Sequence, residues 1–430
     1  MSAFKKYVAA IARCYTQSSL ILRIVIGLVI GAFLGVFVKN WTFLGVLGDL
    51  FVGGLKAMAP ILVFVIVSGA LAQSRSRLDS RFGTVLFLYL LTTLDAAVLA
   101  VFTSFAFPQK VALQSASEGL TAPQGLSEVF STLLSNLVAN PFSAITNGNY
   151  IGILFWAVLF GLAMKRIASK ESKTFMVNVS DAVSQIVRWI IGFAPFGICG
   201  LVYTNVSTNG LAIFQDYGKL LALLVGTMLL QALVIAPFIA FLFLHRNPYP
   251  LLFRCLRESG VTAFFTRSSA ANIPVNMALC EKLELDKDMY SVAIPLGATI
   301  NMDGAAITIT VMTLAAANTL GIQVSIPAAI VLSFLSALGA CGASGVAGGS
   351  LLLIPMACSL FGISNDVAMQ VVAVGFIIGV VQDSVETALN SSGDVMFAAT
   401  ADYAQRIREG KPLPEFMQTK RERAAAKAQS

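Results

Sequence analysis

The sequence predicts an all-α protein that crosses a membrane several times. Hydrophobic residues make up 57% of the 430 residues, charged residues only 12%, and the mean hydropathy is +0.80. Soluble domains are roughly 45–50% apolar and about 25% charged. Apolar runs of about 20 residues recur along the chain, and each is long enough to cross a bilayer as a helix. Barrel strands would alternate apolar and polar residues, which these runs do not.

We expect eight transmembrane helices. They cover residues 20–38, 43–71, 82–107, 141–164, 178–203, 218–244, 290–317 and 367–400. Residues 108–140, rich in Ser, Gln, Pro and Gly, form the longest polar connection, and the charged tail after Asp402 is expected to be a mobile end. The first span, "SLILRIVIGLVIGAFLGVFV", is too long for the apolar core of a signal peptide.

The formal charge of +7 is distributed as in a membrane protein and does not indicate a nucleic-acid partner. Lys and Arg gather near both termini and in alternate short connections, such as Arg75 to Arg81 and Lys165 to Lys173. Because such clusters stay on the cytoplasmic side, we expect both termini there and the 108–140 loop outside. The six cysteines lack a CxxC spacing and mostly lie in apolar runs, so they predict neither disulfides nor a metal site.

Two apolar segments are interrupted near their middle. Residues 258–281 are broken by Arg-Ser-Ser and by Pro274, and residues 328–362 are broken by "GACGASGVAGGS". Glycine weakens helices, and non-helical backbone survives at membrane depth only against protein or a water-filled cavity. We predict two re-entrant helical hairpins, the first opening from the cytoplasm and the second from outside; a Gly-rich packing helix is the alternative for 328–362. Opposed hairpins, each followed by a long span, indicate the inverted repeat of a transporter.

The last span carries a polar stripe. At 100° per residue, Asp383, Thr387, Asn390 and Asp394 fall within an arc of about 60°, with Glu386 at its edge. Such a stripe requires a watery or ion-bearing cavity opposite it, although burial against other polar groups is an alternative. Arg267, in the first hairpin, either balances one of these carboxylates or is exposed to the cytoplasm.

The stretch "PLGATINMDG" combines glycines with Asn301 and Asp303 inside an apolar span. No Lys or Arg lies nearby in sequence, while carboxylate, amide and freed carbonyl oxygens suit a hard cation such as Na⁺. Tyr89, Thr92 and Thr93 on the third span are further oxygen donors. The pattern assigns no role to Asp95, which follows them.

The motifs "TRSSAANIP", "PLGATINMDG" and "ALNSSGD", in this order and with the Gly-rich hairpin between the last two, resemble the dicarboxylate/amino acid:cation symporter family, the glutamate-transporter homologues. The resemblance covers essentially the whole chain. It implies a homotrimeric, elevator-type transporter with a rigid scaffold and a mobile transport domain. The implied scaffold is residues 1–73 and 141–203, and the transport domain is 82–107 and 218–402, with an external loop at 108–140 and a cytoplasmic tail at 403–430.

The resemblance also implies site residues. One sodium site would use Gly297, Asn301, Asn390 and Asp394; a second, Thr299, Ala337, Leu338 and Ala340; and a third, Tyr89, Thr92, Thr93, Asn301 and Asp303. The implied substrate set is Arg267, Ser268, Ser269, Ala305, Asp383, Glu386, Thr387 and Asn390. Within it, Ser269 and the Asn390 amide would meet the substrate carboxylate, and Asp383 and the Arg267 carbonyl would meet the ammonium.

Two positions depart from the members that carry acidic substrates. Ala305 replaces a Thr, and Glu386 replaces the Arg that holds the side-chain carboxylate. A negative Glu386 would repel aspartate or glutamate but can accept a hydrogen bond from a hydroxyl. This favours serine or threonine, and the chain is most similar to the bacterial members of the family that carry these with sodium across the inner membrane.

Other functions fit less well. Proton coupling or a broader neutral amino acid range is the nearest alternative, since carboxylates also carry protons. An ion channel would not need two opposed hairpins. An intramembrane hydrolase could recruit Ser268 and Asp303, but no His or Lys base is placed beside a serine. We therefore expect a transporter without an enzymatic activity or an organic cofactor, with sodium as the coupling ion.

Overall fold

The computed structural model describes residues 18–38, 41, 43–73, 80–113, 134–135, 137–343 and 348–418. Within these residues the protein is all-α and contains no strand, as the sequence predicts. Six helices are long and apolar enough to cross a membrane, and the described residues give a seventh crossing if the bent pair α8 and α9 is one span. The chain is therefore a multi-pass membrane protein.

The helices divide at the middle of the chain. The first half holds α2 (Leu20–Phe37), α3 (Phe43–Gln73), α4 (Ser80–Ala106), α6 (Pro141–Asn147), α7 (Tyr150–Ile167), α8 (Lys170–Gly192) and α9 (Ala194–Asn209). The second half holds α10 (Ile213–Leu230), η1 (Gln231–Ile235), α11 (Ala236–Leu244), α12 (Tyr249–Cys255), η2 (Leu256–Gly260), α13 (Val261–Thr266), α14 (Ser269–Lys282), α15 (Lys287–Ile300), α16 (Asp303–Thr319), α17 (Ile326–Ala340), η3 (Ser350–Leu353), α18 (Ile354–Ser359), α19 (Asn365–Arg408) and η4 (Glu415–Met417).

Each predicted span corresponds to one or more helices, with three differences in detail. The span expected at 141–164 starts as the short α6, which ends at Gly148 in the left-handed conformation. The span expected at 178–203 begins earlier, at Lys170, and bends by 52° at Phe193. Pro195 in the first turn of α9 accounts for this bend because it has no N–H to continue the helical ladder. The last helix, α19, runs for 44 residues and ends beyond the predicted span.

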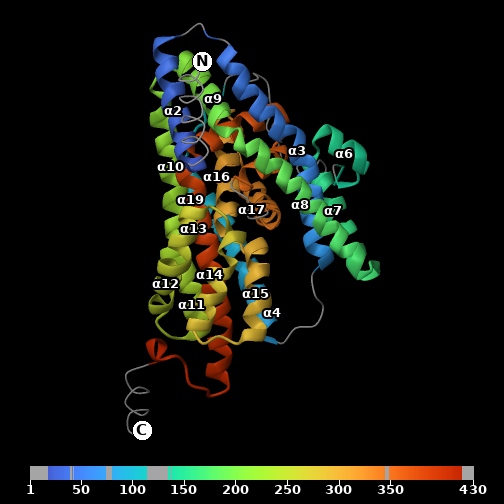
Figure 1. Ribbon diagram of the computed structural model, residues 1–430, viewed down its shortest axis with the longest axis vertical. Coiled ribbons are helices and arrows are strands. Elements are labelled where there is room, and N and C mark those ends of the chain that lie inside the picture. The colour runs from blue at the N-terminus through green and yellow to red at the C-terminus, as the bar shows by residue number, and fades with distance from the viewer. Residues whose placement is uncertain are drawn as a thin grey trace, which may run out of the picture.

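The helices pack as two groups (Figure 1). In the outer group, α2 packs on α9, and α3 packs on α7, α8 and α9. In the central group, which comprises α4 and α10 to α19, α16 and α19 form the core, and residues 303–317 of α16 are all buried. The groups touch where Lys56 forms an ion pair with Asp366, and where the rings of Phe51 and Phe376 meet edge to face at 5.1 Å.

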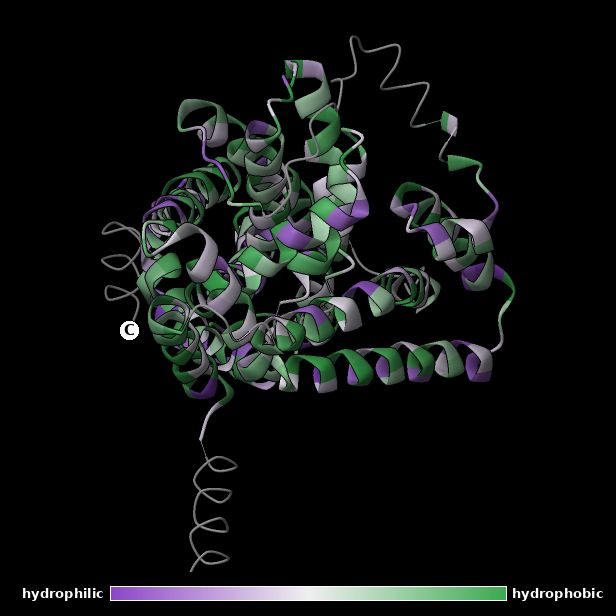
Figure 2. Cartoon of the chain, turned by 90° about the horizontal axis from the view of Figure 1, so that it is seen from above, coloured by the Kyte–Doolittle hydropathy of each residue, from purple (hydrophilic) through white to green (hydrophobic). Residues whose placement is uncertain are grey.

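Apolar side chains also cover the outside of the protein. Large hydrophobic residues are exposed along α2 and α3, for example Phe33, Phe37 and Leu50. Seen from above, hydrophobic residues predominate on the peripheral helices (Figure 2). An exposed apolar surface of this extent is typical of a membrane protein, where these side chains contact lipid.

Both interrupted segments fold as helix, break, helix. In the first, the chain reverses at Arg267, whose φ of 52° is left-handed, and α14 then returns. Its first arm starts at Tyr249, earlier than the expected 258. Pro274 lies inside α14 and does not break it, so that part of the prediction is wrong. In the second segment α17 stops at Ala340 and η3 starts at Ser350, which excludes a continuous packing helix. Residues 344–347 at its tip lie outside the described residues.

The C-terminal segment packs against the base of the central group. Leu413 and Met417 are buried, and Phe416 lies 4.2 Å from the guanidinium of Arg254 and 6.5 Å from the ring of Tyr403. The expectation of a mobile end after Asp402 is therefore wrong for residues 403–418, because apolar side chains of this segment pack against Tyr403 and Arg254. Residues 419–430 lie outside the described part of the chain.

A glycine stripe joins α2 to α9. Gly27, Gly31 and Gly35, four residues apart, lie against the backbone of α9. A Cβ on Gly31 would lie 3.1 Å from both the Cα and the carbonyl carbon of Cys199. Small residues at this spacing let two membrane helices approach at backbone contact distance.

We expect Gly31→Ala to lower the melting temperature of the purified protein, measured by size-exclusion chromatography after heating in detergent. Overpacking a close contact costs about 1–3 kcal/mol, which exceeds the roughly 0.5–1 kcal/mol that Ala gains over Gly in a helix. The matched control is Gly226→Ala in α10, where an added Cβ meets no atom within 4 Å. The control should keep or raise the melting temperature; a stabilised Gly31→Ala would contradict the close packing.

Candidate functional site

The central feature of the site is a break between α15 and α16. The residues at the break, Asn301 and Met302, are buried, as are all residues of α16 from Asp303 to Ala317. Two backbone N–H groups at the break donate to side chains of other helices: Met302 N to Thr93 Oγ1 at 3.1 Å, and Gly304 N to Asn390 Oδ1 at 2.7 Å. The polar residues around the break thus satisfy the backbone groups that an intact helix would have paired.

Asn301 joins three parts of the protein. Its Nδ2 donates to Asp394 Oδ1 at 3.0 Å and to the Asn390 carbonyl at 3.3 Å, both on α19. Its Oδ1 accepts from Thr92 Oγ1 of α4 at 3.3 Å. The structure therefore brings together residues that lie more than 200 positions apart in the sequence.

Asp303 is surrounded by neutral donors. Thr93 Oγ1 donates to Oδ1 at 3.2 Å, and Gln231 Nε2 donates to Oδ2 at 3.1 Å. Gln231 is fully buried on the π-helical turn η1 and was not among the predicted residues. Its signal in the sequence is a lone amide within the apolar run "MLLQALVIAP".

Asp394 has one carboxylate oxygen without a partner. The side chain is fully buried, and Oδ2 accepts no hydrogen bond from any described residue. Tyr89 donates to the backbone carbonyl of Asp394 at 2.8 Å and leaves the carboxylate untouched. A Cβ on Gly297 would lie 2.8 Å from Asp394 Oδ1, so only glycine lets the α15 backbone approach this oxygen.

These two acids lack a basic partner. Among the described residues, no Lys, Arg or His forms an ion pair with Asp303 or Asp394. A buried carboxylate needs a compensating charge, and carboxylate, amide, hydroxyl and carbonyl oxygens are the donor set that hard cations prefer. The chemistry of this cluster therefore fits a small monovalent cation.

The second predicted cation set lies where the ends of α15 and α17 meet. Cys341, just after α17, donates weakly from Sγ to the Ile300 and Ala337 carbonyls, at 3.5 and 3.4 Å. This contact brings Ala337 and Ala340 toward the end of α15, which carries Thr299. The Thr299 hydroxyl itself bonds to the Leu296 carbonyl, and the Leu338 side chain is 49% exposed. Among the described residues, no hydrogen bond joins Thr299 to α17.

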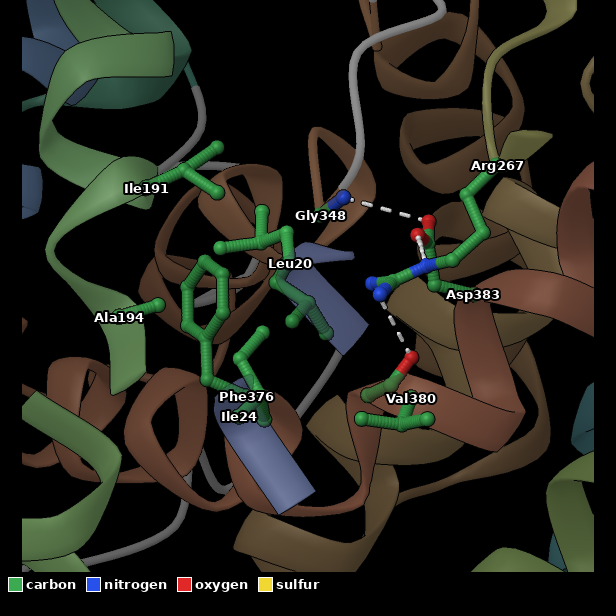
Figure 3. A pocket seen from close by; sticks show the side chains of 11 residues that line it. Leu20, Ile24, Ile191, Ala194, Arg267, Gly348, Phe376, Val380 and Asp383 are labelled. Carbon is green, nitrogen blue, oxygen red and sulfur yellow. Dashed lines mark hydrogen bonds and ion pairs between the residues drawn. The ribbon is translucent and has the colours of Figure 1, made fainter. Parts of the chain in front are cut away.

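Arg267 and Asp383 form an ion pair at the first hairpin's reversal. The Nε–Oδ2 distance is 2.6 Å, and the Arg267 side chain is only 11% exposed. Gly348 N donates to the other Asp383 oxygen at 3.2 Å, so both hairpins converge on this carboxylate (Figure 3). Of the two alternatives for Arg267, the structure shows the pairing with a carboxylate.

A pocket adjoins this ion pair at the boundary between the two groups of helices. Leu20 and Ile24 of α2, Ile191, Ala194 and Phe376 supply apolar walls, and Arg267 and Asp383 supply the polar side (Figure 3). A ligand in contact with Asp383 would therefore lie between the outer group and the hairpins.

Asn390 is held at the break in α16. Oδ1 accepts from Gly304 N, and the one acceptor that Nδ2 finds among the described residues is the sulfur of Met302, at 3.4 Å. Sulfur is a weak hydrogen-bond acceptor, so the Asn390 Nδ2 group can donate instead to a stronger acceptor, such as an oxygen of a ligand.

Two other predicted substrate residues, Ser268 and Thr387, have local roles in the structure. Ser268 caps α14 by accepting from Ala271 N at 3.2 Å, and Ser269 beside it is buried. Thr387 donates to the Asp383 carbonyl one turn earlier, at 2.7 Å. Neither capping nor back-bonding prevents a hydroxyl from contacting a ligand as well.

Three uncharged donors surround one carboxylate oxygen of Glu386. Thr308 Oγ1, Ser350 Oγ and Gln382 Nε2 donate to its Oε2 at 2.7, 2.9 and 2.5 Å. Ala305, the other departure from the acidic-substrate pattern, is fully buried on α16. Sequence reasoning singled out Glu386 but missed its three donors.

A second buried network of hydrogen bonds joins the first hairpin to α19. The sequence did not predict it. Asn272 and Asn276 both donate to Ser391 Oγ, at 2.7 and 3.0 Å, and Asn272 also bonds Ser259 at 3.1 Å. The spacing of four residues between the two asparagines on α14 was the available signal. Asp95, by contrast, has a buried Oδ2 without a partner among the described residues, and nothing assigns it a role.

Comparisons with known proteins identify transporters as relatives of this chain. Residues 20–404 match the sodium:dicarboxylate symporter family. The chain is 68% identical to "Serine/threonine transporter SstT" of Bifidobacterium adolescentis over 424 residues, 99% of each chain. It is 60% identical to the protein of that name from Streptococcus agalactiae, over 91% of this chain and 97% of the relative, and 56% identical to the one from Streptococcus thermophilus, over 93% and 99%.

We expect Na⁺ to raise the melting temperature of the purified protein in detergent, relative to choline at equal ionic strength. A ligand at 100 times its dissociation constant stabilises a folded state by about 2.7 kcal/mol. Asp394→Asn should abolish most of this effect because it removes the carboxylate that lacks a counter-charge.

The matched control is Asp288→Asn, the same substitution at an exposed position of α15. The control should keep the full sodium effect. Equal stabilisation of wild type and Asp394→Asn by sodium would contradict a cation site at this carboxylate.

Proposed function

Since the chain belongs to the sodium:dicarboxylate symporter family, we propose that it imports serine and threonine by symport with sodium ions. The relatives that share 56–68% identity over most of its length carry the name serine/threonine transporter. The observation that carries the sodium coupling is the buried Asp394 oxygen without a partner, in a cluster of neutral oxygen donors.

The substrate backbone would bind between the hairpins and α19. Its ammonium would replace the Arg267 guanidinium as the partner of Asp383. In the structure, Arg267 Nε lies 2.6 Å from Asp383 Oδ2. Its carboxylate would take the Asn390 amide away from the Met302 sulfur, with the Ser269 hydroxyl as a second donor. Ser268, Thr387 and the Arg267 carbonyl would complete the set.

The substrate side chain would meet Glu386. No described Lys or Arg bonds this carboxylate. The side-chain carboxylate of a bound aspartate or glutamate would therefore be repelled by Glu386 and would find no cation to pair with among the described residues. A hydroxyl can donate to it. Ala305 leaves room where acidic-substrate members carry Thr. Serine and threonine satisfy these conditions, whereas aspartate and glutamate do not.

Sodium would bind at three places. The first uses Asp394 and Asn301 with the Gly297 and Asn390 carbonyls, and the third uses Asp303 with Thr92, Thr93, Tyr89 and Asn301. The second would form from the Thr299, Ala337, Leu338 and Ala340 carbonyls, where α17 meets α15. Because this second site includes part of the second hairpin, sodium there would favour the closed position of that hairpin and couple the gradient to uptake.

The two groups of helices supply the moving parts. The outer group would be the scaffold of a homotrimer, and the central group the transport domain that moves like an elevator past it. The pocket beside Arg267 and Asp383 lies at their boundary, where substrate must enter. Both termini would face the cytoplasm in a bacterial inner membrane.

Purified protein in liposomes should accumulate labelled L-serine when Na⁺ is high outside and K⁺ is inside. Accumulation should disappear when choline replaces Na⁺ at fixed pH, and excess L-threonine, but not L-aspartate, should compete. Liposomes without protein are the control. Uptake that ignores sodium, or that an inward proton gradient drives alone, would overturn the proposal in favour of proton coupling.

A further inference from the structure

Three elements converge on one oxygen of Glu386. Thr308 comes from α16, Ser350 from η3 on the return arm of the second hairpin, and Gln382 from the preceding turn of α19. All three donors are at least 99% buried, and Glu386 is 95% buried. Gln382 also donates to Thr308 at 2.7 Å, which closes a ring of hydrogen bonds around Oε2. We call these three donors the Glu386 cage.

The cage uses only half of the carboxylate. All three bonds go to Oε2, and Oε1 accepts none from the described residues. Three donors on one oxygen prevent the carboxylate from turning, so Oε1 has a fixed direction. A preorganised acceptor of this kind loses little freedom when it binds a donor.

The cage is also uncharged. A Lys or Arg in its place would neutralise Glu386 and compete with a hydroxyl for its lone pairs. Thr, Ser and Gln hold the carboxylate but leave it a strong acceptor. Gln382 Oε1, fully buried and without a partner among the described residues, adds a second unsatisfied acceptor at the same place.

We propose that Gln382, Thr308 and Ser350 are positioning residues for substrate specificity: they aim Glu386 Oε1 at the hydroxyl of the substrate. This inference rests on the proposed function, because it names what sets the preference for a hydroxy amino acid. Sites built to bond a hydroxyl reject the analogue that lacks it, since a buried acceptor is then left unpaired. The analogue here is L-alanine.

Ser350 links this recognition to the second hairpin. It donates to Glu386 only while η3 is packed against α16 and α19. The return arm of the hairpin therefore helps to orient Glu386 Oε1, the proposed acceptor for the substrate hydroxyl. If this arm were displaced, Ser350 would no longer donate to Glu386.

The test is the ratio of kcat/KM for L-serine to that for L-alanine, measured as sodium-driven uptake into liposomes. Gln382→Met, Thr308→Val and Ser350→Ala should each lower this ratio, by about tenfold for Gln382→Met, the residue with two bonds in the ring. The sodium concentration that gives half-maximal thermal stabilisation without serine should stay as in wild type, because none of these side chains bonds Asp303 or Asp394. Thr308→Ser, which keeps the hydroxyl, should retain the ratio.

Thr310→Val is the matched control. Thr310 lies two residues further along α16, is fully buried, and has a hydroxyl without a partner among the described residues. This variant should keep the wild-type ratio. If Gln382→Met does not reach the membrane, Ser350→Ala, which removes one oxygen, provides the same comparison.

The inference would be overturned by cage variants that keep the wild-type ratio, or by a Thr310→Val ratio as low as that of Thr308→Val. Wild-type protein that takes up serine and alanine equally well would overturn it too. Failure of the proposed function looks different, because wild-type protein would then show no sodium-dependent serine uptake at all.

Discussion

The need to compensate buried negative charge governs the rest of this structure. Asp303 and Asp394 are buried inside the protein, and every hydrogen bond that their side chains receive from the described residues comes from a neutral group. An uncompensated carboxylate at that depth costs several kcal/mol, so the fold is stable with ionised acids only if a cation accompanies them. The break at Asn301 and Met302 serves this need, because it places the Asn301 amide between Asp394, to which its Nδ2 donates, and Thr92, which donates to its Oδ1. Thr93 and Asn390 then satisfy the backbone N–H groups that the break exposes. The same residues therefore stabilise the break and line the cation cluster.

Charge is compensated differently at the hairpins. Asp383 has a basic partner in Arg267, but that partner lies at a chain reversal beside a pocket, where a ligand's ammonium can take its place. Glu386 has three neutral donors, and no described Lys, Arg or His forms an ion pair with it. Along one helix, α19, the acids thus differ by environment: Asp394 suits a metal ion, Asp383 suits an ammonium, and Glu386 suits a hydroxyl. In the proposed function, this division lets one helix contribute to both ion and substrate binding.

The sequence predicted the fold class, the order of the spans and the break in "NMDG", because apolar length, helical periodicity and glycine content act locally. It could not predict that α14 continues through Pro274. There, Asn272 and Asn276 on either side of the proline bond to Ser391, and this tertiary contact offsets one lost backbone bond. Gln231, Thr308, Ser350 and Gln382 were missed for a related reason. Each is an ordinary polar residue on its own helix and acquires a role only from an acid on another turn or another element.

In the proposed function, sodium and serine bind as one coupled set around α15, α16 and α19. Thermodynamic linkage requires each ligand to change the affinity of the other by the same factor. The most direct measurement is the dissociation constant of L-serine for purified protein at increasing sodium concentration, with choline keeping the ionic strength constant. The account predicts that serine affinity rises at least about tenfold as sodium increases over its binding range, a coupling of about 1.4 kcal/mol. A serine affinity independent of sodium would contradict it.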